Sequence, residues 1–206
     1  KAAACLVRVV ILVAEDGVNY DGGVEIRWPG SDEWLKRLTF NITYFRSDVD
    51  DLITRTYDAR GVGKSVNISG SVIDGLEIGL CSDFLKYFRF VFNGTWQDTE
   101  NQNNIEAFDG KKLPGRFEES YMARIEARYK GFKIYSEYLI EKDLYYDTAN
   151  LLKAQDKEEI NAGISWLFRS FLLTFDAKNL GDDQYEDFNG YPLPGRSYSF
   201  NMKYEF

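Results

Sequence analysis

The chain has 206 residues, with 33 aspartates and glutamates against 25 lysines and arginines, and a net charge of −8. This acidic balance argues against a nucleic-acid-binding protein, which needs a basic surface. The chain has no histidine, which excludes Ser-His-Asp and Cys-His catalysis and histidine-ligated metal sites.

The N-terminal segment, residues 1–18, has no clear strand pattern. Its apolar runs, Ala2–Val7 and Val9–Ala14, are separated by Arg8. Both runs are far shorter than the roughly 20 residues that a membrane-spanning helix needs. We therefore treat 1–18 as a separate segment that holds one strand at most, and expect the sheet to occupy residues 19–206.

From residue 24 onward, apolar and polar residues alternate in a series of segments. This is the pattern of β-strands that have one apolar and one polar face. The segments are 24–28, 38–44, 76–81, 88–96, 121–129, 132–141, 160–166, 171–178 and 197–206. With one further strand allowed for the N-terminal segment, the sequence predicts an all-β, antiparallel sheet of about ten strands.

The connections between these segments alternate between short and long. Short ones fall at 29–35, 83–86, 129–131 and 167–170. Long polar ones are expected at 15–22, 58–63, 99–119, 143–156 and 179–196. Tight turns at one end of a sheet and wide loops at the other are typical of outer-membrane β-barrels.

Two interpretations of the alternation compete. A soluble sandwich buries its apolar face in a core, whereas a membrane barrel turns that face to lipid and its polar face to the lumen. Aromatic rings at the strand ends favour the barrel, because tyrosine and tryptophan suit a membrane interface. These rings are Trp28, Trp34, Tyr44, Tyr87, Trp96, Tyr129, Tyr138, Trp166, Tyr198 and Tyr204. In a barrel, Arg124 and Glu126 should form lumenal salt bridges with Lys133 and Glu137.

Three stretches near the C-terminus occur together in this order: 179–186 (NLGDDQYE), 190–198 (GYPLPGRSY) and the final Tyr-Glu-Phe. In this combination they resemble the C-terminal sequence of TonB-dependent outer-membrane receptors. Residues 43–53 resemble an internal hairpin of the same barrel, as do 74–78. The resemblance covers residues 19–206, and implies a 22-stranded barrel closed by an N-terminal plug. This chain would supply the last ten or so strands of that barrel.

The resemblance also implies a function, which is TonB-dependent uptake of a scarce chelate across the outer membrane of a Gram-negative bacterium. An iron–siderophore complex and cobalamin are examples of such a chelate. No catalysis and no cofactor are implied. The implied partners are the lipid bilayer, the plug and remaining barrel strands in the same or a separate chain, the TonB system acting through the plug, and the barrel-assembly machinery.

The alternative is a self-contained small outer-membrane barrel, such as a pore, an adhesin or an engineered scaffold, without active transport. An open sheet in lipid leaves two edges with unpaired backbone groups. We therefore expect further strands to complete the sheet rather than closure of these strands on themselves. An outer-membrane enzyme ranks last, because the barrel proteases and phospholipases depend on histidine.

The candidate ligand-binding residues lie in the loops 101–109 and 144–150, which combine polar and aromatic side chains that can stack on or hydrogen-bond a ligand. They are Asn103, Asn104, Phe108, Tyr145 and Tyr146. A loop that folds over the barrel opening without touching ligand is an equal alternative.

Two further features have a functional and a plain interpretation. The C-terminal Phe206 resembles the C-terminal aromatic residue that the barrel-assembly machinery recognises. The plain alternative is that Phe206 is simply the last lipid-facing side chain.

The carboxylates of Asp48, Asp50 and Asp51 could bind Ca²⁺. Because they lack EF-hand spacing, we expect solvated loop charges there and no metal site.

Overall fold

The computed structural model describes residues 12–30, 34–57, 62–188 and 190–204. In this part of the chain there are eleven strands: β1 (Asp16–Trp28), β2 (Leu35–Tyr57), β3 (Gly63–Phe84), β4 (Phe88–Gln102), β5 (Glu119–Tyr129), β6 (Phe132–Lys142), β7 (Lys157–Phe168), β8 (Phe171–Lys178), β9 (Glu186–Phe188), β10 (Tyr191–Pro192) and β11 (Ser197–Tyr204). Nine of them form one antiparallel sheet, in the order β1-β2-β3-β4-β5-β6-β7-β8-β11. The predicted all-β fold of about ten strands is confirmed.

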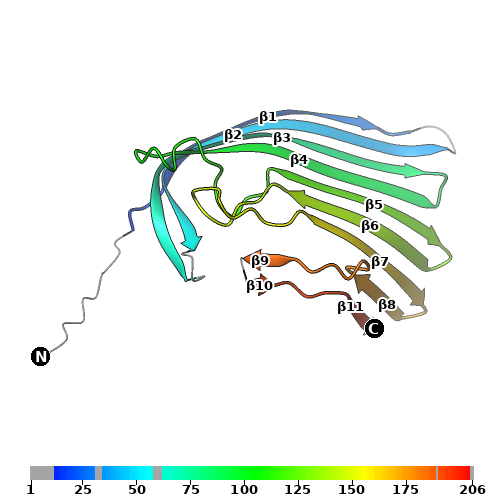
Figure 1. Cartoon of the computed structure of the whole chain (residues 1–206). Helices are drawn as coiled ribbons and strands as arrows, with labels where there is room; N and C mark the ends of the chain where they lie inside the picture. The colour runs from blue at the N-terminus through cyan, green and yellow to red at the C-terminus, as the bar shows by residue number, and fades with distance from the viewer. Residues whose placement is uncertain (1–11, 31–33, 58–61, 189, 205–206) are drawn as a thin grey trace, which may run out of the picture.

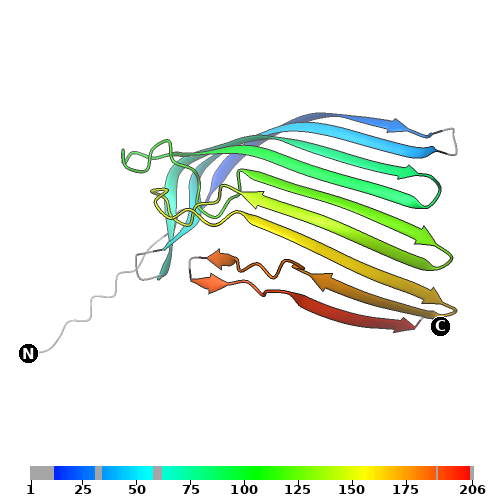
Figure 2. The same cartoon turned by 45° about the vertical axis from the view of Figure 1, so that its right-hand side comes forward.

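The sheet is a single curved layer with a hollow side, as Figures 1 and 2 both show. The tight turns lie at one end of the strands and the longer connections at the other. β1 and β11 are the two edges, and within the described residues they do not pair with each other. This arrangement counts against the alternative of a barrel closed by these strands alone.

The tight turns follow local backbone rules. β5 and β6 are joined by Lys130 and Gly131, which both have positive φ, 45° and 83°. Two such residues form the hairpin turn whose twist matches that of the flanking strands. β7 and β8 are joined by Arg169, with φ 54°, and Ser170. β3 and β4 are joined by residues 85–87, of which Leu85 and Lys86 have positive φ. The short connections predicted at these three places are confirmed.

Two expectations for the N-terminal half are wrong. The predicted loop 15–22 falls largely within β1, where residues 16–22 pair with 44–50 of β2. Residues 43–53 are not a hairpin but part of the 23-residue strand β2, and 74–78 lie within β3. Backbone pairing continues here although the apolar alternation stops, so the residue pattern does not reveal the strands.

The long part of β2 and β3 forms an arm, which we define as residues 45–57 and 63–75. At the base of the arm Tyr44 pairs with Leu76. The arm carries the apolar cluster of the described chain, in which Leu52, Ile68 and Ile73 pack against Leu113 from a loop. The described residues contain no helix long and apolar enough to span a membrane.

Candidate functional site

The two faces of the sheet reverse the usual distribution of polar and apolar residues. On the outer face, Ile125 and Ile134 are 47% and 52% exposed, whereas on the inner face Glu126 and Asn161 are only 8% and 5% exposed. A soluble sandwich would bury the isoleucines instead. The arrangement is stable when hydrocarbon covers the outer face and a polar interior lies against the inner one.

Aromatic side chains mark both borders of the apolar outer face. At the turn end, the rings of Phe132 and Trp166 stack with their centroids 5.4 Å apart. At the loop end, the hydroxyls of Tyr121 and Tyr138 each donate a hydrogen bond to a carboxylate, Glu119 or Glu158, at 2.8 Å. Such rings with one apolar body and one polar tip suit a membrane interface.

The distance between the two borders fits a bilayer. On β5 the face runs from Tyr121 to Tyr129, within the eleven-residue strand. A membrane-spanning β-strand, which is tilted in the bilayer, needs about 9–11 residues. Beyond the loop-end border, the outward positions of β2 become charged, and Arg46 pairs there with Asp48 at 3.0 Å. The apolar face therefore ends at the base of the arm.

The inner face carries a network of charged side chains centred on Arg124. Its guanidinium donates to Glu126 at 2.9 Å and to Glu137 on the next strand at 3.3 Å. It also lies over the ring of Tyr135, 3.8 Å from the centroid. These contacts confirm the predicted ladder, except that Lys133 is in no ion pair among the described residues.

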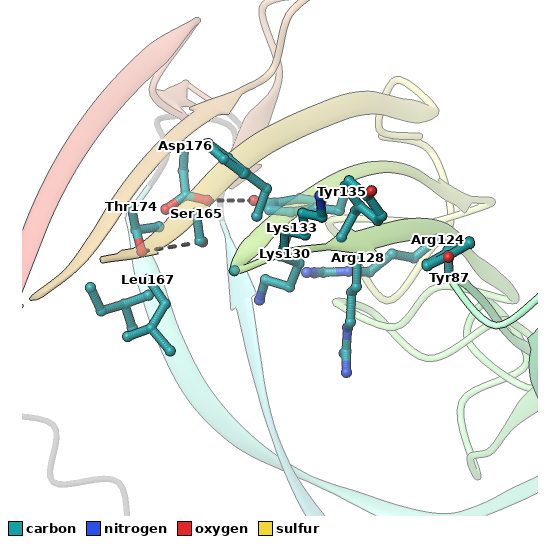
Figure 3. Close-up of a pocket in the computed structure, with 14 residues that line it drawn as sticks. Tyr87, Arg124, Arg128, Lys130, Lys133, Tyr135, Ser165, Leu167, Thr174 and Asp176 are labelled. Carbon is teal, nitrogen blue, oxygen red and sulfur yellow. Dashed lines mark hydrogen bonds between the residues drawn. The ribbon is translucent and has the colours of Figure 1, made fainter. Parts of the chain in front are cut away.

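A pocket of about 790 Å³ opens on this face near the tight turns, and we call it the turn-end pocket. Figure 3 shows its side chains projecting from β5, β6, β7 and β8. Four cations line it, Arg124, Arg128, Lys130 and Lys133, and Asp176 accepts a hydrogen bond from Tyr135 at 2.8 Å. The inner face is therefore cationic at the turn end.

At the other end, three loops form one connected layer. We call the loops 103–118, 143–156 and 179–196 together the loop cluster. Asn150 accepts a hydrogen bond from the Lys112 backbone N–H at 2.7 Å and donates one to the Lys112 carbonyl at 3.0 Å. These bonds join the first two loops through the backbone of one and a side chain of the other.

The third loop is attached through tyrosines. The Tyr185 hydroxyl donates to the carbonyl of Glu158 at 2.5 Å and accepts from the N–H of the same residue at 3.0 Å. Burial raises the pKa of Tyr185, which keeps the hydroxyl protonated. The Tyr146 hydroxyl donates to the carbonyl of Glu186 at 3.2 Å.

A second pocket, of about 360 Å³, lies under the loop cluster, and we call it the loop-end pocket. It is lined by Gly115, Phe117, Glu141, Leu144, Ala154, Gln155, Lys157, Tyr185, Glu186 and Leu193. It combines rings, aliphatic groups and a few charged groups, as small-molecule sites do. The sequence did not identify this set, because its members come from three loops and two strands that meet only in the folded sheet.

The predicted ligand residues lie in the loop cluster but not in the lining of that pocket. Asn103 shapes its own loop, because its Oδ1 accepts a hydrogen bond from the Ile105 N–H at 2.9 Å. Asn104 is exposed and Phe108 is half-buried. In the next loop Tyr145 is half-buried and Tyr146 is buried. Their role in ligand binding stays a prediction.

The other candidate residues are placed as follows. Phe206 lies outside the described residues. Asp48, Asp50 and Asp51 belong to β2 and not to a loop, so the expectation of loop charges is wrong. The described part of the chain holds no group of three or more His, Cys, Asp or Glu side chains that could bind a metal ion.

Leu113 anchors the loop cluster to the arm. Its side chain is 1% exposed, and its N–H donates to Thr99 Oγ1 at 3.0 Å. Replacing it with alanine should cost about 3 kcal/mol of local stability, because truncating a buried leucine also leaves a cavity. We expect a protease to cut within 103–118 at least about tenfold faster in Leu113→Ala, since cleavage needs local opening. Leu151→Ala, at an 82% exposed position, should leave the rate unchanged, and equal rates in both variants would contradict this anchoring.

Comparison with known proteins identifies the sheet. The family model described as "TonB dependent receptor-like, beta-barrel" matches residues 11–180. A search of curated proteins finds no match. Among solved structures, the ferric yersiniabactin uptake receptor FyuA from Yersinia pestis is 18% identical, with a TM-score of 0.74 over 93% of this chain and 30% of that one.

Two other solved structures are similar. The copper transporter OprC is 14% identical, with a TM-score of 0.74 over 93% of this chain and 31% of that one. The siderophore receptor PiuA from Acinetobacter baumannii is 16% identical, with a TM-score of 0.69 over 90% and 28%. The chain thus spans about three tenths of the length of these proteins.

Proposed function

Because the chain belongs to the TonB-dependent receptor-like β-barrel family, we propose that it forms the C-terminal part of the wall of a receptor in the outer membrane of a Gram-negative bacterium. The receptor takes up a scarce metal chelate. The exposed apolar outer face, bordered by aromatic rings and backed by a buried polar inner face, is the observation that carries this proposal. The similar structures include siderophore receptors and a copper transporter, which supports the substrate class.

In this function the wall does no chemistry on its cargo. The outer face contacts the bilayer, and the open edges at β1 and β11 pair with the remaining strands, because unpaired backbone groups in lipid cost several kcal/mol each. The plug fills the hollow side, the loop cluster meets the chelate, and the TonB system supplies the work of transport through the plug. The barrel-assembly machinery inserts the strands.

Energy-dependent uptake tests the proposal. Cells that carry the intact receptor should accumulate its metal chelate only when TonB is present, and should still bind the chelate at the surface when TonB is absent. Deleting the receptor should remove both uptake and binding. Passage of small solutes without TonB would instead favour the alternative of a passive pore.

A further inference from the structure

The segments around the loop-end pocket carry an excess of carboxylates. Segments 97–119 and 141–159 each contain six aspartates and glutamates against three lysines and arginines, and 178–196 contains four against two. The turn-end pocket is the opposite, with four cations and one carboxylate. The segments around the loop-end pocket are therefore acidic, whereas the lining of the turn-end pocket is basic.

Two lysines of the loop end are each engaged by two carboxylates. Lys157 is shared between Glu141 at 3.2 Å and Glu159 at 3.4 Å. Lys112 is likewise shared, between Asp98 and Glu118. Burial lowers the pKa of Lys112, but the hydrogen bonds that its ammonium group donates to the two carboxylates outweigh this and raise the pKa. Each of these ammonium groups is already compensated by two carboxylates.

Within the pocket this leaves no uncommitted positive charge. Lys157 is the one cation among the described residues that line it, and its two partners hold it. The second carboxylate of the lining, Glu186, accepts a hydrogen bond from the Gly190 N–H at 2.8 Å. Phe117 and Tyr185 add ring surfaces to the wall. The pocket thus offers hydrogen-bond acceptors and apolar contacts, but its described lining has no unpaired cationic side chain.

We propose that the loop-end pocket selects metal chelates of neutral or positive net charge and rejects anionic ones. The inference rests on the proposed function, since it names the substrate class of the same receptor. An anionic chelate would place its negative charge beside the carboxylates of the pocket, where no unpaired cation is available to compensate it. Such repulsion contributes to specificity as much as attraction does. A cationic or neutral chelate meets the carboxylates and rings directly.

Uptake of a charge series tests the inference in cells that carry the intact receptor. The series uses ferric trihydroxamates whose side arm ends in an ammonium, a hydroxyl or a carboxylate group, together with an anionic ferric tris-catecholate. We expect the ammonium and hydroxyl forms to be taken up at least about tenfold better than the carboxylate form, which corresponds to 1.4 kcal/mol. A preference for the carboxylate form or the tris-catecholate overturns the charge inference alone, whereas failure to take up any of them contradicts the proposed function as well.

A substitution locates the selectivity. Glu141→Gln keeps the shape of the side chain and leaves Lys157 with one carboxylate, so uptake of the carboxylate form should rise about tenfold relative to the hydroxyl form. The matched control is Glu100→Gln, at an exposed position of β4 outside the pocket, which should not change the ratio. Heat-modifiable gel mobility checks that both variants are folded. Equal ratios in the two variants, or an equal loss of all chelates in Glu141→Gln, would overturn the assignment to this pocket.

Discussion

Replacing Phe200 with arginine should prevent stable insertion of the wall into a bilayer. Phe200 is 65% exposed and lies between the ring positions Tyr198 and Tyr204 on the outer face of β11. In water, arginine at so exposed a position would be tolerated. At the middle of a bilayer it costs about 2–4 kcal/mol, and the loss of the contact with lipid tails adds to this.

The neighbouring residue supplies the control. Ser199 is also exposed, but faces inward and pairs in register with Asp176, so Ser199→Arg gains a carboxylate neighbour. Urea unfolding of the intact receptor in phospholipid vesicles would measure both variants. We expect a large loss of unfolding free energy for Phe200→Arg and a small change for Ser199→Arg. A similar small change in both would mean that the outer face does not contact hydrocarbon.

The second large effect is expected from Arg124→Leu. The side chains of Arg124, Glu126 and Glu137 are mostly buried, and Arg124 links β5 to β6. Removing it leaves two carboxylates without their shared cation, at a cost of about 3 kcal/mol, as for other broken buried ion pairs. Glu126 keeps Arg128 at 2.6 Å, which limits the loss.

An exposed ion pair provides the comparison for Arg124→Leu. Arg27 pairs with Glu25 at 2.5 Å, and both side chains are largely exposed. Arg27→Leu should therefore cost less than about 1 kcal/mol. The same unfolding measurement applies to both variants. If Arg124→Leu costs no more than Arg27→Leu, the network does not hold the two strands together.

Much of the sheet could be predicted because its strands have one mainly apolar and one mainly polar face. In β5, β6, β7, β8 and β11 nearly every second residue is apolar or aromatic, so the pattern is visible in the residues themselves. The arm was missed because the outward positions beyond its base at Tyr44 are charged, as with Arg46 and Asp48. Nothing in that stretch alternates, although backbone pairing continues to Tyr57.

The candidate site could be predicted only in part. Polar and aromatic residues in the long loops pointed to the end of the sheet where the loop-end pocket lies, but none of the residues chosen from them lines that pocket. The hydroxyl of Tyr146, for example, donates to the Glu186 carbonyl. The loop-end pocket depends on Glu141 and Lys157, which lie on adjacent strands and look like ordinary strand residues in the sequence. Contacts between distant loops cannot be deduced from a single sequence.

The two-sided character of each strand also sets how errors of assembly are detected. A register shift of one residue between neighbours such as β7 and β8 would turn the apolar side chains of the shifted strand to the polar inner face. Its charged side chains would then face the lipid. Such a misaligned wall could not remain in the membrane. In the proposed outer-membrane setting, the bilayer would therefore select the correct strand alignment, in addition to being the solvent of the finished wall.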